Sequence, residues 1–151
     1  LCGGGVGITP VMSMLKDIFN VGQYSDEGRK IRAHSIDTVY SMWIVPNKED
    51  ADWFKEEIKS CMNNSKHIAR MPKLVVWVHV SRAKGPLEAP LIAGRPKMKE
   101  LFADMESNHP KSSMLCFACG PSPMVNELWD LSIERTRKGG RVDFHHETFE
   151  F

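Results

Sequence analysis

The stretch that decides the fold lies near the first residue of the chain and reads Gly3-Gly4-Gly5-Val6-Gly7-Ile8-Thr9-Pro10. Glycines permit tight turns and let the backbone approach a ligand closely. Thr9 is a good N-cap and Pro10 suits a first helical position, so we predict that a helix begins there, with free N–H groups that attract anions. The stretch therefore predicts either a pyrophosphate-binding loop or a plain tight turn. It is not the G-x-G-x-x-G fingerprint, because Ile8 stands where the third glycine would be.

Strands and helices are predicted to alternate along the rest of the chain. The residues that precede the glycines are predicted to be the end of a first strand. Runs of β-branched and aromatic residues predict four more strands, at 38–45, 74–80, 113–119 and 141–149. Apolar residues at helical spacing predict helices at 9–20, 47–62, 98–105 and 124–137. The second helix is expected to bury Trp53, Phe54, Ile58, Cys61 and Met62, and residues 81–96 are expected to form a loop.

This order predicts an α/β fold: a doubly wound, mainly parallel five-stranded sheet with helices on both faces and a truncated first strand. We expect one domain over residues 1–151. Leu1 is not an initiating Met, and a glycine turn normally follows a full strand, so we expect the chain to be a fragment of a longer polypeptide.

Composition excludes several classes of protein. The formal net charge of +1 does not indicate a nucleic-acid or membrane-surface binder, and no apolar run is long enough to cross a bilayer. The four cysteines have no disulfide-framework spacing, which favours a reducing compartment.

Ligands of open α/β sheets bind beyond the carboxyl ends of the strands, and several candidate residues fall there. Ser81 and Arg82 offer a hydroxyl beside a guanidinium, which suits a phosphate monoester, although a solvated loop is the plainer interpretation. Cys116 and Cys119 are three residues apart on a strand and must face opposite ways, so we predict no metal or dithiol there. Cys116 is expected in the core, and Cys119 is expected to face a ligand.

His145 and His146 are adjacent strand residues that point in opposite directions, so we expect no metal site from this pair either.

Five segments, in one order, resemble the NAD(P)H-binding domain of the ferric reductase and NADPH oxidase family, itself related to ferredoxin–NADP reductases. They are the glycine stretch 3–10, Trp43 with Trp53-Phe54, Gly94-Arg95-Pro96, Cys119-Gly120-Pro121, and Phe144-His145-His146-Glu147-Thr148-Phe149. The resemblance covers nearly the whole chain.

The resemblance implies that the chain binds NADPH and positions it for hydride transfer to FAD, in an enzyme that passes electrons through haem to oxygen or to ferric iron. It implies an FAD-binding domain upstream in the same polypeptide, haem-bearing membrane helices before it, and a place on the cytosolic face of a membrane. The fragment alone is then expected to be inactive.

The resemblance also implies roles for single residues. The glycine stretch from Gly3 to Pro10 would hold the pyrophosphate, with Thr9 and Cys119 beside the nicotinamide. Ser81 and Arg82 are similar to the Ser-Arg pair with which ferredoxin–NADP reductases hold the 2′-phosphate. Family motifs add Arg95, Gly120 and Pro121 as cofactor contacts. Phe149 by spacing, or Phe151 by its terminal position, would stack on the flavin.

Two departures from the family pattern leave alternatives open. Pro46-Asn47 occupies the place where the oxidases carry a phosphate-binding Arg, and Glu150-Phe151 extend past the usual last residue. A soluble flavin reductase of the ferredoxin–NADP or cytochrome b5 type is the alternative enzyme. A nucleotide-sensing module without hydride transfer is the alternative outside enzymes.

Overall fold

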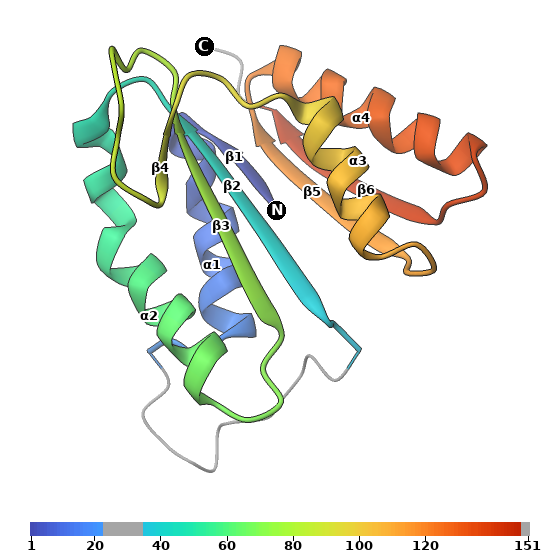
Figure 1. The fold of residues 1–151 in the computed structure, drawn as a ribbon, viewed down its shortest axis with the longest axis horizontal. Helices are drawn as coiled ribbons and strands as arrows, with labels where there is room; N and C mark the ends of the chain where they lie inside the picture. Colours follow the sequence, from blue (N-terminus) through green and yellow to red (C-terminus); the bar gives the residue numbers. More distant parts are fainter. Residues whose placement is uncertain (23–34, 149–151) are drawn as a thin grey trace.

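The computed structural model describes residues 1–22 and 35–148, and its fold is drawn in Figure 1. These residues contain six strands: β1 (Cys2–Gly4), β2 (Thr38–Val45), β3 (Lys73–Val80), β4 (Leu91–Ala93), β5 (Met114–Gly120) and β6 (Val142–Thr148). All pairs of neighbours are parallel, in the order β4-β3-β2-β1-β5-β6. The strands therefore end at one common edge, the upper edge in Figure 1.

Helices cover both faces of this sheet (Figure 1). The helical segments are η1 (Gly5–Gly7), α1 (Ile8–Ile18), η3 (Lys48–Phe54), α2 (Lys55–His67), α3 (Met98–Asn108) and α4 (Ser122–Arg137). Helices α1 and α2 pack with Trp43, Val78 and Phe117 in one apolar layer. Helices α3 and α4 pack with Met42 and Cys116 in the other. Neighbouring strand residues enter opposite layers because side chains alternate along a strand.

The predicted doubly wound parallel α/β architecture is confirmed, with one strand more than expected. The extra strand is β4, which lies inside the predicted loop 81–96 and pairs with β3. It has three residues, and Ile92 and Ala93 are exposed. A strand this short at a sheet edge has too few residues to show an alternating pattern.

The start of the second predicted helix is also different. Asn47 does cap the segment, since the carboxylate of Asp50 accepts hydrogen bonds from its backbone N–H and its side-chain amide. However, residues 48–54 form the 3₁₀ helix η3, and α2 follows from Lys55. The prediction that Trp53 is buried was wrong: it is 55% exposed, because a 3₁₀ turn does not continue the apolar face of an α-helix.

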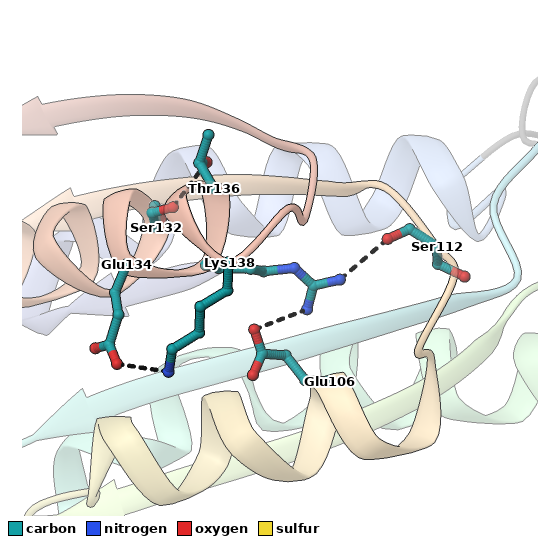
Figure 2. A network of polar contacts seen from close by, with 7 residues as sticks. Glu106, Ser112, Ser132, Glu134, Thr136 and Lys138 are labelled. Carbon is teal, nitrogen blue, oxygen red and sulfur yellow. Dashed lines mark hydrogen bonds and ion pairs between the residues drawn. The ribbon is translucent and has the colours of Figure 1, made fainter.

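A buried arginine ties α4 to α3 and to the connection that follows α3. Arg135 is 6% exposed; its Nη2 donates to the carbonyl of Ser112 at 3.0 Å, and its Nη1 lies 3.7 Å from a carboxylate oxygen of Glu106. Figure 2 shows these contacts beside the exposed pair of Glu134 and Lys138 on α4, whose closest atoms are 2.7 Å apart. The network fixes the end of the sheet opposite the carboxyl edge.

Candidate nucleotide-binding edge

The middle of the sheet contains a topological switch point. β1 lies between β2 and β5, and the chain builds β2, β3 and β4 on one side before it crosses to β5 and β6 on the other. Connections therefore leave β1 and β5 toward opposite faces, which opens a crevice at their carboxyl ends. The glycine stretch follows β1 and Gly120-Pro121 follow β5, so the fold brings two predicted segments together here.

Glycines make this junction closer than side chains would allow. A Cβ atom at Gly4 would lie 2.8 Å from Cδ of Pro121, and one at Gly7 would overlap the carbonyl of Cys119. A Cβ at Gly3 would lie 2.8 Å from the Cα of Ile8. The glycines are thus required by packing at this junction.

The helix after the glycines begins two residues earlier than predicted. Its first residue is Ile8 and its N-cap is Gly7, so Thr9 lies within the first turn and is exposed, and Pro10 follows it. The prediction of Thr9 as N-cap was wrong because the 3₁₀ turn η1 leads directly into α1. No side chain caps the helix and no acidic residue lies in its first turn. Its N-terminus therefore keeps the positive potential that favours an anion.

A buried tryptophan on β2 contacts the glycine stretch, and this contact was not predicted. Nε1 of Trp43 donates a hydrogen bond to the carbonyl of Gly5 at 3.0 Å. Trp43 is 1% exposed, and its ring meets Phe54 edge-on at 6.0 Å between centroids. A tryptophan in a strand predicts burial, but the partner of its N–H depends on the tertiary fold.

Ser81 and Arg82 lie at the same edge, directly after β3. Their backbone N–H groups donate to the carbonyls of Val45 and Pro46 at 2.8 and 3.0 Å, so they continue the pairing of β3 with β2. Ser81 is half-buried and Arg82 is exposed. Within the described part of the chain the guanidinium of Arg82 has no hydrogen bond or ion pair, which leaves it available to an anion at this edge.

Residues 1–84 and 66–133 match the family described as the ferric reductase NAD-binding domain. The chain belongs to this family. The match includes the glycine stretch, Trp43, Ser81-Arg82 and the end of β5, and so covers the whole switch point.

Relatives of this NAD-binding domain are much longer proteins. Respiratory burst oxidase homolog protein B of Solanum tuberosum is 25% identical over 99% of the chain, which covers 20% of that relative. NADPH oxidase 4 of Homo sapiens is 22% identical over 97% of the chain and 25% of the relative. Respiratory burst oxidase homolog protein D of Arabidopsis thaliana is 24% identical over 99% of the chain and 20% of the relative. The chain thus spans between a fifth and a quarter of their length. Among its own described helices, none is both long and apolar enough to cross a membrane.

The third motif of the NAD-binding domain, Gly94-Arg95-Pro96, is held against β3. The N–H of Gly94 donates to the carbonyl of Val80 at 2.9 Å. The Gly94 carbonyl lies 3.1 Å from Nδ1 of His79, and because a carbonyl only accepts, Nδ1 carries the proton. Burial lowers the pKa of His79, a shift partly offset by this hydrogen bond. Arg95 itself is exposed, and His79 is a neighbour that the motif did not predict.

Cys119 lies at the end of β5 beneath the glycine stretch. It is fully buried, and its Sγ lies 3.8 Å from Oε2 of Glu147 on β6. Burial raises the pKa of the Cys119 thiol, and the negative charge of Glu147 raises it further, so the sulfur is a neutral thiol at physiological pH. Glu147 is a second neighbour that sequence reasoning missed, since the contact arises from the register of two strands.

Cys116 belongs to the opposite apolar layer from Cys119, as strand alternation predicted, and it is buried in the core. His145 and His146 are both exposed. Over residues 1–22 and 35–148, no group of three or more His, Cys, Asp or Glu side chains is arranged to hold a metal. The predicted flavin-stacking residues Phe149 and Phe151 lie outside the described residues.

Proposed function

We propose that this NAD-binding domain binds NADPH across the switch point between β1 and β5 and presents the nicotinamide to FAD held by another domain of the same polypeptide. The observation that carries the proposal is the glycine junction. Gly4, Gly7 and Gly120 exclude side chains where the β1 and β5 ends meet, beside a helix N-terminus without an acidic neighbour. A dinucleotide with a central pyrophosphate is the ligand class that fits such a junction.

Each end of the dinucleotide has candidate contacts. The backbone from Gly3 to Gly7 would hold the pyrophosphate. On the β2–β3 side, Ser81 and Arg82 would hold the 2′-phosphate, because the exposed guanidinium has no competing partner among the described residues. On the β5 side, Thr9, Cys119 and Pro121 would surround the nicotinamide. Arg95, exposed beyond β4, would add positive charge to the edge.

The proposed reaction is hydride transfer, to which the chain contributes position rather than a covalent step. FAD, when bound by its own domain, supplies the hydride acceptor. NADPH would give up one hydride and leave as NADP⁺, and the chain's own residues would only hold the nicotinamide in place for that transfer. Cys119, as a neutral thiol buried against Glu147, would fix the face on which the nicotinamide lies.

We further propose that the whole protein is a membrane flavocytochrome, as the resemblance to the ferric reductase and NADPH oxidase family implies. Electrons would then pass singly through haem to oxygen, as the name NADPH oxidase indicates, or to ferric iron, as the family description indicates. The NAD-binding domain would lie on the cytosolic face. The length of the relatives supports further domains in the same polypeptide.

Stopped-flow reduction of the flavin in the intact polypeptide tests the proposal. We expect NADPH to bleach the flavin absorbance in a single-turnover phase that saturates with NADPH concentration. Binding of NADP⁺ in a calorimeter without any flavin reduction by NADPH would support the nucleotide-sensing alternative instead. Absence of binding by both NADP⁺ and NAD⁺ would refute both interpretations.

A further inference from the structure

One peptide of the glycine stretch is not held by close packing. Gly3, Gly4 and Gly7 are each enclosed by neighbouring backbone or proline atoms. Gly5 is different: its backbone has a φ of +55°, and nothing lies within 4 Å of the position that a Cβ would take. The left-handed conformation is open to glycine, but glycine also adopts many others. No atom near the Cβ position therefore restricts the backbone of Gly5.

Two hydrogen bonds to one carbonyl supply the missing constraint. The carbonyl oxygen of Gly5 accepts the N–H of Ile8, which closes the 3₁₀ turn. It also accepts the indole N–H of Trp43 at 3.0 Å. Trp43 cannot follow a moving loop, because its ring is 1% exposed in the α1–α2 layer and meets Phe54 edge-on. The indole thus fixes the direction of the Gly5 carbonyl from the rigid interior of the sheet.

Because the peptide is planar, the hydrogen bond that orients the Gly5 carbonyl also orients the N–H of Val6. In a trans peptide the C=O of one residue and the N–H of the next point in opposite directions. Since the Gly5 carbonyl points inward to Trp43, the N–H of Val6 points away from Trp43. Val6 is 48% exposed, in agreement with an outward-facing peptide. Val6 lies in the first turn of η1, and the first N–H groups of a helical segment have no acceptor within that segment. The Val6 N–H therefore has no partner inside the turn.

We infer that Trp43 is a positioning residue for the dinucleotide: its indole N–H holds the Gly5–Val6 peptide so that the Val6 N–H faces the pyrophosphate. The inference rests on the proposed function for the identity of the ligand. It does not rest on that function for the ordering of the loop, which is a property of the unliganded chain. Trp43 is not among the residues proposed to hold the 2′-phosphate or the nicotinamide, so its effect should be common to NADPH and NADH.

The test compares Trp43→Phe with Phe54→Leu in the intact polypeptide. Trp43→Phe removes the indole N–H and keeps an aromatic ring, whereas Phe54→Leu disturbs the packing around Trp43 and keeps the hydrogen bond. Calorimetric titrations use NADP⁺, NAD⁺ and 2′-AMP, which has the adenosine and the 2′-phosphate but neither phosphate of the pyrophosphate. We expect Trp43→Phe to weaken NADP⁺ and NAD⁺ equally, by about 2- to 12-fold, the effect of one ordinary hydrogen bond. Its affinity for 2′-AMP should not change, and Phe54→Leu should bind all three ligands normally.

A measurement without ligand decides the loop-ordering step separately. Hydrogen–deuterium exchange of a peptide that spans residues 1–12 should be faster in Trp43→Phe than in the wild type, because the Ile8 amide opens with the Gly5 carbonyl. It should be unchanged in Phe54→Leu.

Unchanged exchange and unchanged NADP⁺ affinity in Trp43→Phe would overturn the inference. Equal weakening of NADP⁺ and 2′-AMP would also overturn it, since that pattern means general damage to the edge. If the wild type binds no nucleotide, the proposed function fails, and the exchange data still decide whether Trp43 orders the loop.

Discussion

Arg82 and Cys119 lie on one edge of the sheet in opposite environments. The guanidinium of Arg82 is exposed and has no partner within residues 1–22 and 35–148, whereas Cys119 is fully buried beneath the glycine stretch. An exposed cation can be replaced with little effect on packing, so its removal reports mainly on ligand binding. A buried thiol contributes to both packing and ligand position, and the two effects must be separated.

Arg82→Ala tests the 2′-phosphate assignment. If the guanidinium binds this phosphate, the change removes charge-assisted hydrogen bonds of about 1.5–3 kcal/mol, which corresponds to a rise of about 10- to 150-fold in KM for NADPH. KM for NADH should hardly change, because NADH lacks the phosphate. Steady-state kinetics of the intact polypeptide with both coenzymes measures the difference. Equal losses with the two coenzymes would make Arg82 a structural residue.

Cys119→Ala should slow hydride transfer more than it weakens NADPH binding. The sulfur lies 3.8 Å from Oε2 of Glu147, and the carbonyl of Cys119 packs against Gly7. A shift of the nicotinamide by about 1 Å can cost around 100-fold in rate. Stopped-flow flavin reduction gives the rate, and calorimetry with NADP⁺ gives the affinity. Cys116→Ala is the matched control, since Cys116 lies in the opposite apolar layer. It should lower the melting temperature and leave the rate of flavin reduction unchanged. A normal rate in Cys119→Ala would remove this residue from the site.

At the scale of elements, the predictions from sequence succeeded where a pattern runs over several residues. The predicted strand 38–45 is β2 to the residue, and the predicted strand 74–80 is β3 with one more residue at its start. β4 was not predicted, because three residues at a sheet edge are too few to show the alternation of apolar and polar side chains that marks a strand. The start of α1 was placed late because η1 has no sequence signature distinct from a turn. The contacts of Trp43 and His79 could not be predicted, since each joins segments far apart in the chain.

The α3–α4 network offers a comparison of a buried and an exposed ion pair (Figure 2). Arg135→Ala removes a buried guanidinium and leaves the carbonyl of Ser112 without its donor, so we expect a loss of about 1.5–3 kcal/mol in the free energy of unfolding. Lys138→Ala breaks an exposed pair with Glu134 and should leave the melting temperature unchanged. Urea unfolding of both variants measures the contrast. Equal stability of the two would mean that the Arg135 contacts contribute nothing net.

The whole molecule buries four free thiols, and this makes its stability fall in alkaline solution. Burial raises the pKa of Cys61 to about 11 and that of Cys2 to about 12, from an ordinary value near 9. Above pH 9 the unfolded chain therefore releases thiol protons that the folded chain retains. Because the unfolded state then binds fewer protons, the free energy of unfolding falls as the pH rises from about 9 to 11.

Urea unfolding between pH 8 and 10.5 measures this dependence. Cys61→Ala should reduce its slope, since it removes one of the thiols from the linkage. Cys61 lies on α2 and is not part of the proposed nucleotide site, so the variant should retain NADP⁺ binding. A slope as steep as that of the wild type would mean that other groups, such as tyrosine or lysine, govern the alkaline transition.

Residues 1–151 by themselves should bind NADPH and not consume it. The sheet has one carboxyl edge with one switch point, and the proposal uses all of that edge for the nicotinamide dinucleotide. NADPH gives up its two electrons together as a hydride, and their passage to ferricyanide or a tetrazolium dye requires the flavin as an intermediate carrier. We expect no decrease in NADPH absorbance when the purified chain is mixed with either acceptor, and turnover once the chain is joined to a flavin-binding domain of its own polypeptide. Rapid NADPH consumption by the chain alone, without added flavin, would show that these residues hold a complete redox site. The proposal that another domain holds the hydride acceptor would then be wrong.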